Sequence, residues 1–85
     1  SAPAVVVYAK QLPPPATGRV YQVWLEGGGV VRNVGTFAPD ANQRAWALLG
    51  PQSALPNPET VFITEEPLPS SPQPSGPEVL RARFP

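Results

Sequence analysis

The sequence contains no cysteine and no histidine, and these two absences exclude several kinds of site at once. Without cysteine there can be no disulfide, no thiolate ligand for zinc and no thiol nucleophile. Without histidine the commonest general base and the commonest imidazole metal ligand are missing too. Methionine is also absent, so the chain lacks an initiator residue, and we expect a processed or excised piece that has lost a targeting or membrane segment upstream.

Charge of either sign is scarce. Six basic and six acidic residues give a formal net charge of zero, and the basic residues stand singly. The sequence therefore offers no basic stripe for nucleic-acid phosphates and no polybasic cluster for anionic lipid. No apolar run approaches the roughly 20 residues that span a bilayer. We expect neither a nucleic-acid partner nor a membrane-spanning segment within these residues.

Proline, in contrast, is abundant. Fourteen prolines and seven glycines bring the composition close to the range in which low-complexity disorder is expected. However, Leu, Ile, Val and Phe make up 21 of the 85 residues, which lies above the roughly 20% below which chains stay disordered. The apolar residues also form blocks, with the prolines collected between them. This distribution predicts one folded domain over residues 1–85 with stiff, proline-rich connections.

Six segments have the character of short β-strands. They are rich in β-branched and aromatic residues, and turn residues separate them about every ten positions. The segments are residues 4–9, 19–26, 30–37, 44–49, 60–65 and 78–83. Residues 44–49 suit a helix or a strand by propensity, but the turn signals on both sides favour a strand. Residues 19–26 are apolar on both faces, which is typical of a central strand.

The connections between these segments carry recognisable turn chemistry. Gly27-Gly28-Gly29 supplies the positive-φ positions of a hairpin turn, and Gly35 indicates either a bulge or a close approach of another backbone segment. Pro39-Asp40-Ala41-Asn42 is a turn, because proline presets φ and the Asp and Asn side chains bond to their own backbone. The pattern predicts an all-β fold, a small antiparallel β-sandwich of about six short strands with Pro-rich loops.

The expected core consists of the large apolar residues on the inward faces of these strands. It comprises Val6, Val20, Val23, Trp24, Leu25, Phe37, Trp46, Leu48, Val61, Ile63 and Leu80. Leu80 and Ala82 form the apolar face of the last segment.

The remaining polar residues do not assemble a catalytic or metal site. Glu65 and Glu66 are adjacent on a strand, so their side chains leave on opposite faces and cannot act as a pair. Asp40 with either glutamate is a poor two-carboxylate glycosidase site, because the turn already accounts for Asp40. Asp40-Ala41-Asn42 has too few oxygens for calcium. Gly27-Gly28-Gly29 lacks the lysine and helix of a phosphate loop. We expect no enzyme activity, no catalytic, cofactor-binding or metal residues, and no cofactor.

Two features have both a functional and a structural interpretation. Tyr21, Trp24 and Trp46, if exposed in a row, would stack on sugar rings, but in so small a domain they are more often the core itself. Gln22, between Tyr21 and Val23, is expected to pair with backbone inside the fold. Residues 69–77 are either an extended polyproline ligand for a partner or a loop stiffened against unfolding and proteolysis.

Four segments in series resemble one bacterial family. Residues 21–25 read Tyr-Gln-Val-Trp-Leu, and after the glycine turn residues 35–40 read Gly-Thr-Phe-Ala-Pro-Asp. Later come Thr64-Glu65-Glu66-Pro67 and the Pro-x-Gly-Pro-x-x-Leu ending of residues 74–80. This series, from about Leu12 to Leu80, is similar to the C-terminal domains of anti-sigma-K factors.

The resemblance implies a membrane-bound anti-sigma factor in three parts. A cytoplasmic segment would hold an extracytoplasmic-function sigma factor inactive, a single membrane helix would follow, and this domain would lie on the extracytoplasmic side. Regulated proteolysis would release the sigma factor. The present chain would then be a regulatory or sensor domain that contacts a protease or envelope partner. The alternative is a non-catalytic carbohydrate- or envelope-binding module of a bacterial surface protein.

Overall fold

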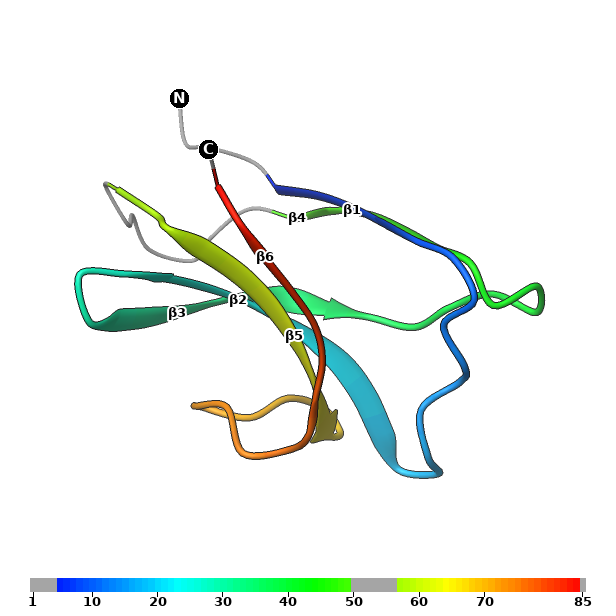
Figure 1. Cartoon of the computed structure of the whole chain (residues 1–85). Helices are drawn as coiled ribbons and strands as arrows, with labels where there is room; N and C mark the ends of the chain where they lie inside the picture. Colours follow the sequence, from blue (N-terminus) through cyan, green and yellow to red (C-terminus); the bar gives the residue numbers. More distant parts are fainter. Residues whose placement is uncertain (1–4, 50–56, 85) are drawn as a thin grey trace.

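The computed structural model describes residues 5–49 and 57–84, and it describes the side chains of residues 8–45 and 57–84. Within these ranges the chain forms six strands and no helix (Figure 1). The strands are β1 (Val5–Ala9), β2 (Arg19–Gly27), β3 (Val30–Phe37), β4 (Ala45–Leu49), β5 (Thr60–Pro67) and β6 (Glu78–Arg83). The predicted all-β fold is confirmed, and each predicted segment matches one strand to within two residues.

The strands form two antiparallel sheets. One sheet has four strands in the order β3-β2-β5-β6, and the other pairs β1 with β4. The central strand β2 pairs with β3 on one side and β5 on the other. Nearly every residue of β2 is buried, as its two apolar faces predict, because one face packs on the second sheet and a loop covers the other.

The main core lies on the face of the four-stranded sheet that meets β1 and β4. Tyr21, Val23, Leu25 and Ile63 are buried there against Ala9, Leu12, Val34 and Ala45, and Val30, Phe37 and Val61 pack at the margin. Of the predicted core, Val20, Val23, Trp24, Leu25 and Ile63 are buried, and Phe37 and Val61 are partly buried. The side chains of Val6, Trp46 and Leu48 lie outside the described residues.

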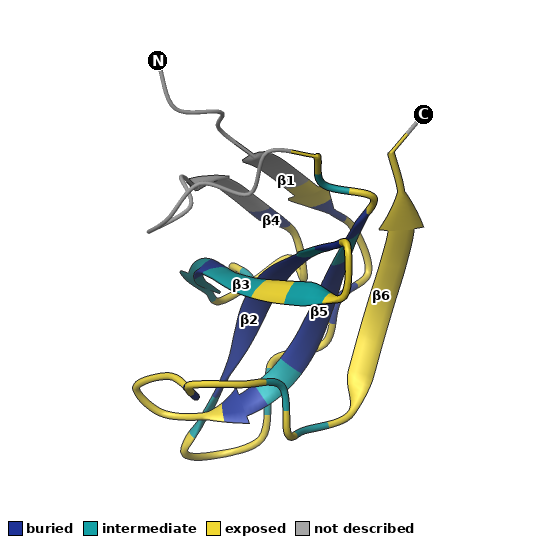
Figure 2. Cartoon of the chain, turned by 90° about the vertical axis from the view of Figure 1, so that its left-hand side faces the viewer, coloured by how far each residue is buried: buried dark blue, intermediate teal, exposed yellow. Residues whose placement is uncertain are grey.

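Leu80 is a correction to the predicted core. It pairs with Ile63 and therefore lies on the core face of the sheet, but it is 43% exposed. The whole of β6 is exposed (Figure 2). The reason is positional, because β6 is the edge strand of a sheet of four, and the opposite sheet of two is too narrow to cover it.

The predicted turns and bulge are confirmed. Gly28 and Gly29 have φ of 59° and 78° at the β2–β3 hairpin. A two-residue hairpin turn of type I′ requires positive φ at both of its central residues. The register of β2 against β3 shifts where Val23 faces Gly35 and Trp24 faces Asn33, so Val34 is the extra residue of a bulge. The Oδ1 atom of Asp40 accepts hydrogen bonds from the backbone N–H groups of Asn42 and Arg44.

Candidate functional site

Polar residues are concentrated on the face of the four-stranded sheet that looks away from β1 and β4. The register pairs Gln22 with Thr64 and Trp24 with Phe62, and residues directly opposite in an antiparallel pair share a face. Glu66 follows Thr64 on the same face because side chains alternate along a strand. The proline-rich segment 68–77, which joins β5 to β6, folds back beneath this face (Figure 1).

Glu66 is the centre of this site. Its side chain is completely buried and accepts four hydrogen bonds. The hydroxyl of Thr64 donates to Oε2 at 2.5 Å, and the hydroxyl of Ser75 donates to Oε1 at 2.6 Å. The backbone N–H groups of Ser75 and Gly76 donate to Oε2 at 3.0 and 3.1 Å. Three of the four donors belong to the loop, so the carboxylate binds the loop to the strand.

These bonds also decide the charge state of Glu66. Burial by itself would raise the pKa of the carboxyl, since it penalises the charged form. The hydrogen bonds from the Ser75 and Thr64 hydroxyls, and from the backbone of Ser75 and Gly76, outweigh burial and lower the pKa to about 2. Glu66 is therefore an anion at neutral pH. Uncharged hydrogen-bond donors stabilise its negative charge, a role that an arginine or lysine more often has.

Gln22 holds the loop at a second point. Its side-chain amide donates to the carbonyl of Ser71 at 3.0 Å, and its Oε1 accepts from the Ser71 N–H at 2.9 Å. Both residues are buried. This reciprocal pair imitates one rung of a β-ladder, and it confirms the prediction that Gln22 pairs with backbone inside the fold.

The loop also touches the backbone of the sheet directly. The N–H of Glu65 donates to the Pro77 carbonyl. Gly76 lies so close to Glu65 that a Cβ at this position would overlap the carbonyl of that residue. Leu68, at the other end of the loop, is 59% exposed, although its N–H bonds to Gly18. Polar contacts at Gln22 and Glu66, together with these backbone contacts, hold the loop on the sheet.

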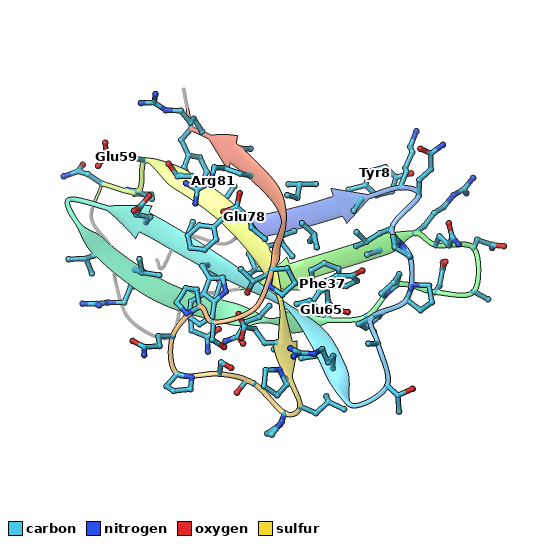
Figure 3. All side chains as sticks on the ribbon, turned by 60° about the horizontal axis from the view of Figure 1, so that its bottom comes forward. Tyr8, Phe37, Glu59, Glu65, Glu78 and Arg81 are labelled. Carbon is cyan, nitrogen blue, oxygen red and sulfur yellow. The ribbon has the colours of Figure 1, made fainter. Side chains whose placement is uncertain are left out.

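A chain of hydrogen bonds extends from Glu66 into the sheet. The indole N–H of Trp24 donates to the Thr64 hydroxyl at 2.9 Å, and that hydroxyl donates to Glu66. The Trp24 ring stacks on Phe62, and the guanidinium of Arg81 lies 4.7 Å from the Phe62 ring centre. Arg81 also forms an ion pair with Glu78 at 2.7 Å (Figure 3), and it lies 3.8 Å from Glu26. One outer face thus combines an aromatic stack with a buried polar relay.

This arrangement is structural rather than catalytic in its chemistry. The oxygens of Glu66 already face four donors, and a carboxylate with a pKa of about 2 is a poor acid or base at neutral pH. Glu65 leaves on the opposite face, as expected, and accepts a hydrogen bond from the Ala16 N–H. Asp40 is used by its own turn. Among the described residues, no group of three acidic side chains is placed to hold a metal ion.

The other candidate features can now be placed. Tyr21 and Trp24 are buried, at 2% and 1% exposure, and the Tyr21 hydroxyl donates to the Pro13 carbonyl. These two aromatic rings therefore belong to the interior, while the Trp46 side chain lies outside the described residues. In residues 5–49 and 57–84 there is no helix long and apolar enough to cross a membrane.

Glu66 is the residue whose importance the sequence interpretation missed. By sequence alone, Glu66 is a candidate only as a partner of Glu65 or Asp40. The available signal was the alternation of β5, which places Thr60, Phe62, Thr64 and Glu66 on one face, and a nearby segment with free N–H donors between prolines, Ser75-Gly76. The two motifs of residues 64–67 and 74–80 are in fact two halves of one hydrogen-bonded unit.

Comparison with known proteins gives two matches. The model of the family described as "Anti-sigma-K factor rskA, C-terminal" matches residues 1–78. A protein of Streptomyces griseus described as "Uncharacterized protein in phr 5'region" is 34% identical over 80 residues, which cover 94% of this chain and 32% of that protein. The chain thus spans about a third of the length of this relative. No solved structure matches.

Proposed function

We propose, from the premise that the chain belongs to the anti-sigma-K factor C-terminal family, that it is the extracytoplasmic regulatory domain of a membrane-bound anti-sigma factor. The sigma factor is the partner of the full-length protein and binds a segment outside this chain. The domain itself acts by folding and contact, without catalysis. Its folded state controls regulated proteolysis, and thereby the release of an extracytoplasmic-function sigma factor.

The observation that carries this proposal is the loop held by Glu66. A long proline-rich loop is an obvious target for a protease, because cleavage requires an extended, mobile backbone. Here the buried carboxylate and Gln22 fasten the loop to the sheet at Ser71, Ser75 and Gly76. The folded domain is therefore protected at its longest described connection, and local opening of this loop creates a cleavable state.

The carboxylates described on the outer face of the sheet are engaged in structural contacts. Both carboxylate oxygens of Glu66 accept hydrogen bonds, and Glu78 and Glu26 form ion pairs with Arg81 on the surface. The alternative of a sugar-binding module depended on an exposed row of aromatic rings. Tyr21 and Trp24 are buried, so two of its three rings are not available for stacking on a ligand.

The test uses the full-length protein with its cognate sigma factor and a reporter gene under a promoter of that sigma factor. The Glu66→Ala variant, which frees the loop, should raise reporter activity and shorten the lifetime of the intact protein. Glu78→Gln is the matched control, because Glu78 is an exposed carboxylate bonded to Arg81, and it should leave both unchanged. Equal reporter activity and equal lifetime for Glu66→Ala and wild type would refute the role of the loop.

Topology is tested separately. Alkaline phosphatase fused after the domain should be active, since the enzyme folds only on the oxidising, extracytoplasmic side. An inactive fusion, with an active cytoplasmic reporter at the same position, would place the domain inside the cell and overturn the proposal.

A further inference from the structure

Strand β6 is an open edge of the larger sheet. Among the described strands it pairs with β5 alone, and Figure 2 shows it at the margin of the molecule, on the side away from β4. Every residue of β6 is exposed. An edge strand offers a row of unpaired N–H and C=O groups to which an extended segment of a partner can add.

The backbone groups that face this open edge can be identified. The Phe84 N–H donates to the Glu59 carbonyl at 2.8 Å, and this bond flanks the pair of Thr60 with Arg83. Because hydrogen-bonded and non-hydrogen-bonded pairs alternate along an antiparallel ladder, Arg83 belongs to a non-hydrogen-bonded pair, and so does Arg81 two positions before it. The N–H and C=O groups of Arg81 and Arg83 therefore point away from β5, toward the open edge.

The core face of β6 carries a row of apolar side chains. Leu80 and Ala82 pair with Ile63 and Val61 of the core, and Phe84 follows them on the same face because side chains alternate along a strand. Leu80 is 43% and Phe84 39% exposed, and Ala82 is exposed too. Exposed apolar side chains that lie together, in contrast to single ones, indicate a contact surface.

The outer face of β6 carries positive charge. Arg81 is bonded to Glu78 at 2.7 Å and lies 3.8 Å from Glu26, so the domain itself balances its charge. Arg83 is exposed. In the described part of the chain, which includes all six acidic residues of the sequence, Arg83 forms no ion pair. An acidic side chain opposite Arg83 on an added strand would form a favourable cross-strand pair.

We propose that the β6 edge binds an extended acidic segment of another protein by strand addition, and that apolar and acidic residues alternate in this segment. Its acidic side chains lie opposite Arg81 and Arg83 on the outer face, and its apolar side chains lie beside the apolar row on the core face. One strand thereby matches the backbone groups, the charge and the apolar row of β6 together. The contact uses no part of the loop 68–77, so the proposal does not depend on the function proposed for that loop.

Two other occupants match this surface less well. A second copy of β6 would bring the arginines of both copies onto one face of two adjacent strands, and like charges in such positions are destabilising. An anionic membrane would have to contact the arginines and the apolar row together, but these lie on opposite faces of β6. An acidic strand engages both faces.

The test titrates the 85-residue chain with the peptide acetyl-Thr-Val-Glu-Val-Glu-Val-Thr-amide and follows the backbone amides by NMR. We expect saturable shifts centred on residues 80–84. Amide exchange should slow at Arg81 and Arg83, and it should change less at Phe84, whose N–H already bonds to Glu59. The same peptide with lysine in place of both glutamates should bind at least about tenfold more weakly, because its charges face the arginines.

Charge reversal in the protein gives a matched comparison. Arg83→Glu should weaken binding of the glutamate peptide at least about tenfold and strengthen binding of the lysine peptide, because the cross-strand charges are exchanged. Leu80→Glu should weaken binding of the glutamate peptide at least about tenfold, because a charge replaces an apolar contact. Arg44→Glu is the control, since Arg44 is an exposed arginine between β3 and β4, and it should bind as wild type does.

Circular dichroism establishes that each variant is folded. A glutamate peptide that fails to bind wild type, or that binds wild type and Arg83→Glu equally, would overturn the proposal. So would a wild-type dimer in light scattering that Leu80→Glu dissociates, because a second copy then occupies the edge. Binding to phosphatidylglycerol vesicles that Leu80→Glu abolishes would also overturn it, because the occupant is then a lipid surface.

Discussion

The Glu66 carboxylate receives both the hydroxyl and the backbone N–H of Ser75, at 2.6 and 3.0 Å. Ser75 is nine positions further along the chain, beyond the end of β5 and after a run of prolines. Prolines have no N–H to offer, so the loop depends on its few other residues for hydrogen bonds to the sheet. The pair Glu66–Ser75, supported by Gly76 and by Gln22–Ser71, is what gives this loop one conformation.

Removal of the Glu66 carboxylate should destabilise the domain and free the loop. Glu66→Ala removes the acceptor of the buried Thr64 hydroxyl and of the partly buried donors of Ser75 and Gly76. A hydrogen bond to a charged group contributes about 1.5 to 3 kcal/mol. We expect a loss of about 3 kcal/mol or more in the free energy of unfolding, measured by urea titration. A broad-specificity protease should then cut within residues 68–77 first.

The control for this prediction is Glu78→Gln, which alters an exposed carboxylate and should change stability by no more than about 0.5 kcal/mol. If Glu66→Ala and Glu78→Gln unfold at the same urea concentration, Glu66 does not hold the loop.

The same residue should make stability depend on acid pH. The folded pKa of Glu66 is about 2, below its ordinary value of 4.5. Because the folded pKa is the lower one, the carboxylate stabilises the fold fully above about pH 4.5, and this contribution is lost progressively as the pH falls toward 2. Urea midpoints of wild type should decline over this window, and those of Glu66→Gln should decline less. Parallel curves for the two proteins would contradict the assignment.

Gly76 and Gly28 should respond differently to substitution. A Cβ at Gly76 would overlap the Glu65 carbonyl, whereas one at Gly28 meets nothing within 4 Å. Gly76→Ala should therefore cost at least about 2 kcal/mol, since backbone must move to admit the methyl group. Gly28→Asn should stay within about 0.5 kcal/mol, because asparagine tolerates the φ of 59° at this position. Thermal melts of the two variants compare them, and a Gly76→Ala protein as stable as Gly28→Asn would exclude the close approach.

Trp24 and Thr64 should be energetically coupled through their hydrogen bond of 2.9 Å. Trp24→Phe keeps a buried aromatic ring but removes the N–H donor, and Thr64→Val removes the hydroxyl at nearly constant volume. Each should cost about 1 to 3 kcal/mol. A double-mutant cycle should give a coupling energy of about 1 kcal/mol. Strictly additive losses would show that the relay from Trp24 to Glu66 contributes no more than its separate parts.

Local patterns explain why the strands and turns could be predicted. Alternating β-branched and aromatic residues fit the pleat wherever they occur, and the turns of Gly28-Gly29 and Asp40 depend on backbone preferences of residues adjacent in sequence. The burial of β2 on both faces also follows from its own composition. For the same reason the prediction that Glu65 and Glu66 leave on opposite faces held, because it requires nothing beyond alternation along one strand.

Long-range arrangement decided the remaining features. Leu80 is apolar and pairs with the core residue Ile63, so its sequence and register are those of a core residue. It is nevertheless exposed, because the opposite sheet of two strands is too narrow to cover the edge strand. Glu66 resembles a surface glutamate in sequence, yet it is buried because a loop nine and ten positions later brings Ser75 and Gly76 onto it. The sequence by itself determined which segments become strands and which become turns, since those are local energies of the backbone. Only the tertiary structure decided which carboxylate is buried and which leucine is left uncovered, because burial depends on what packs from a distance.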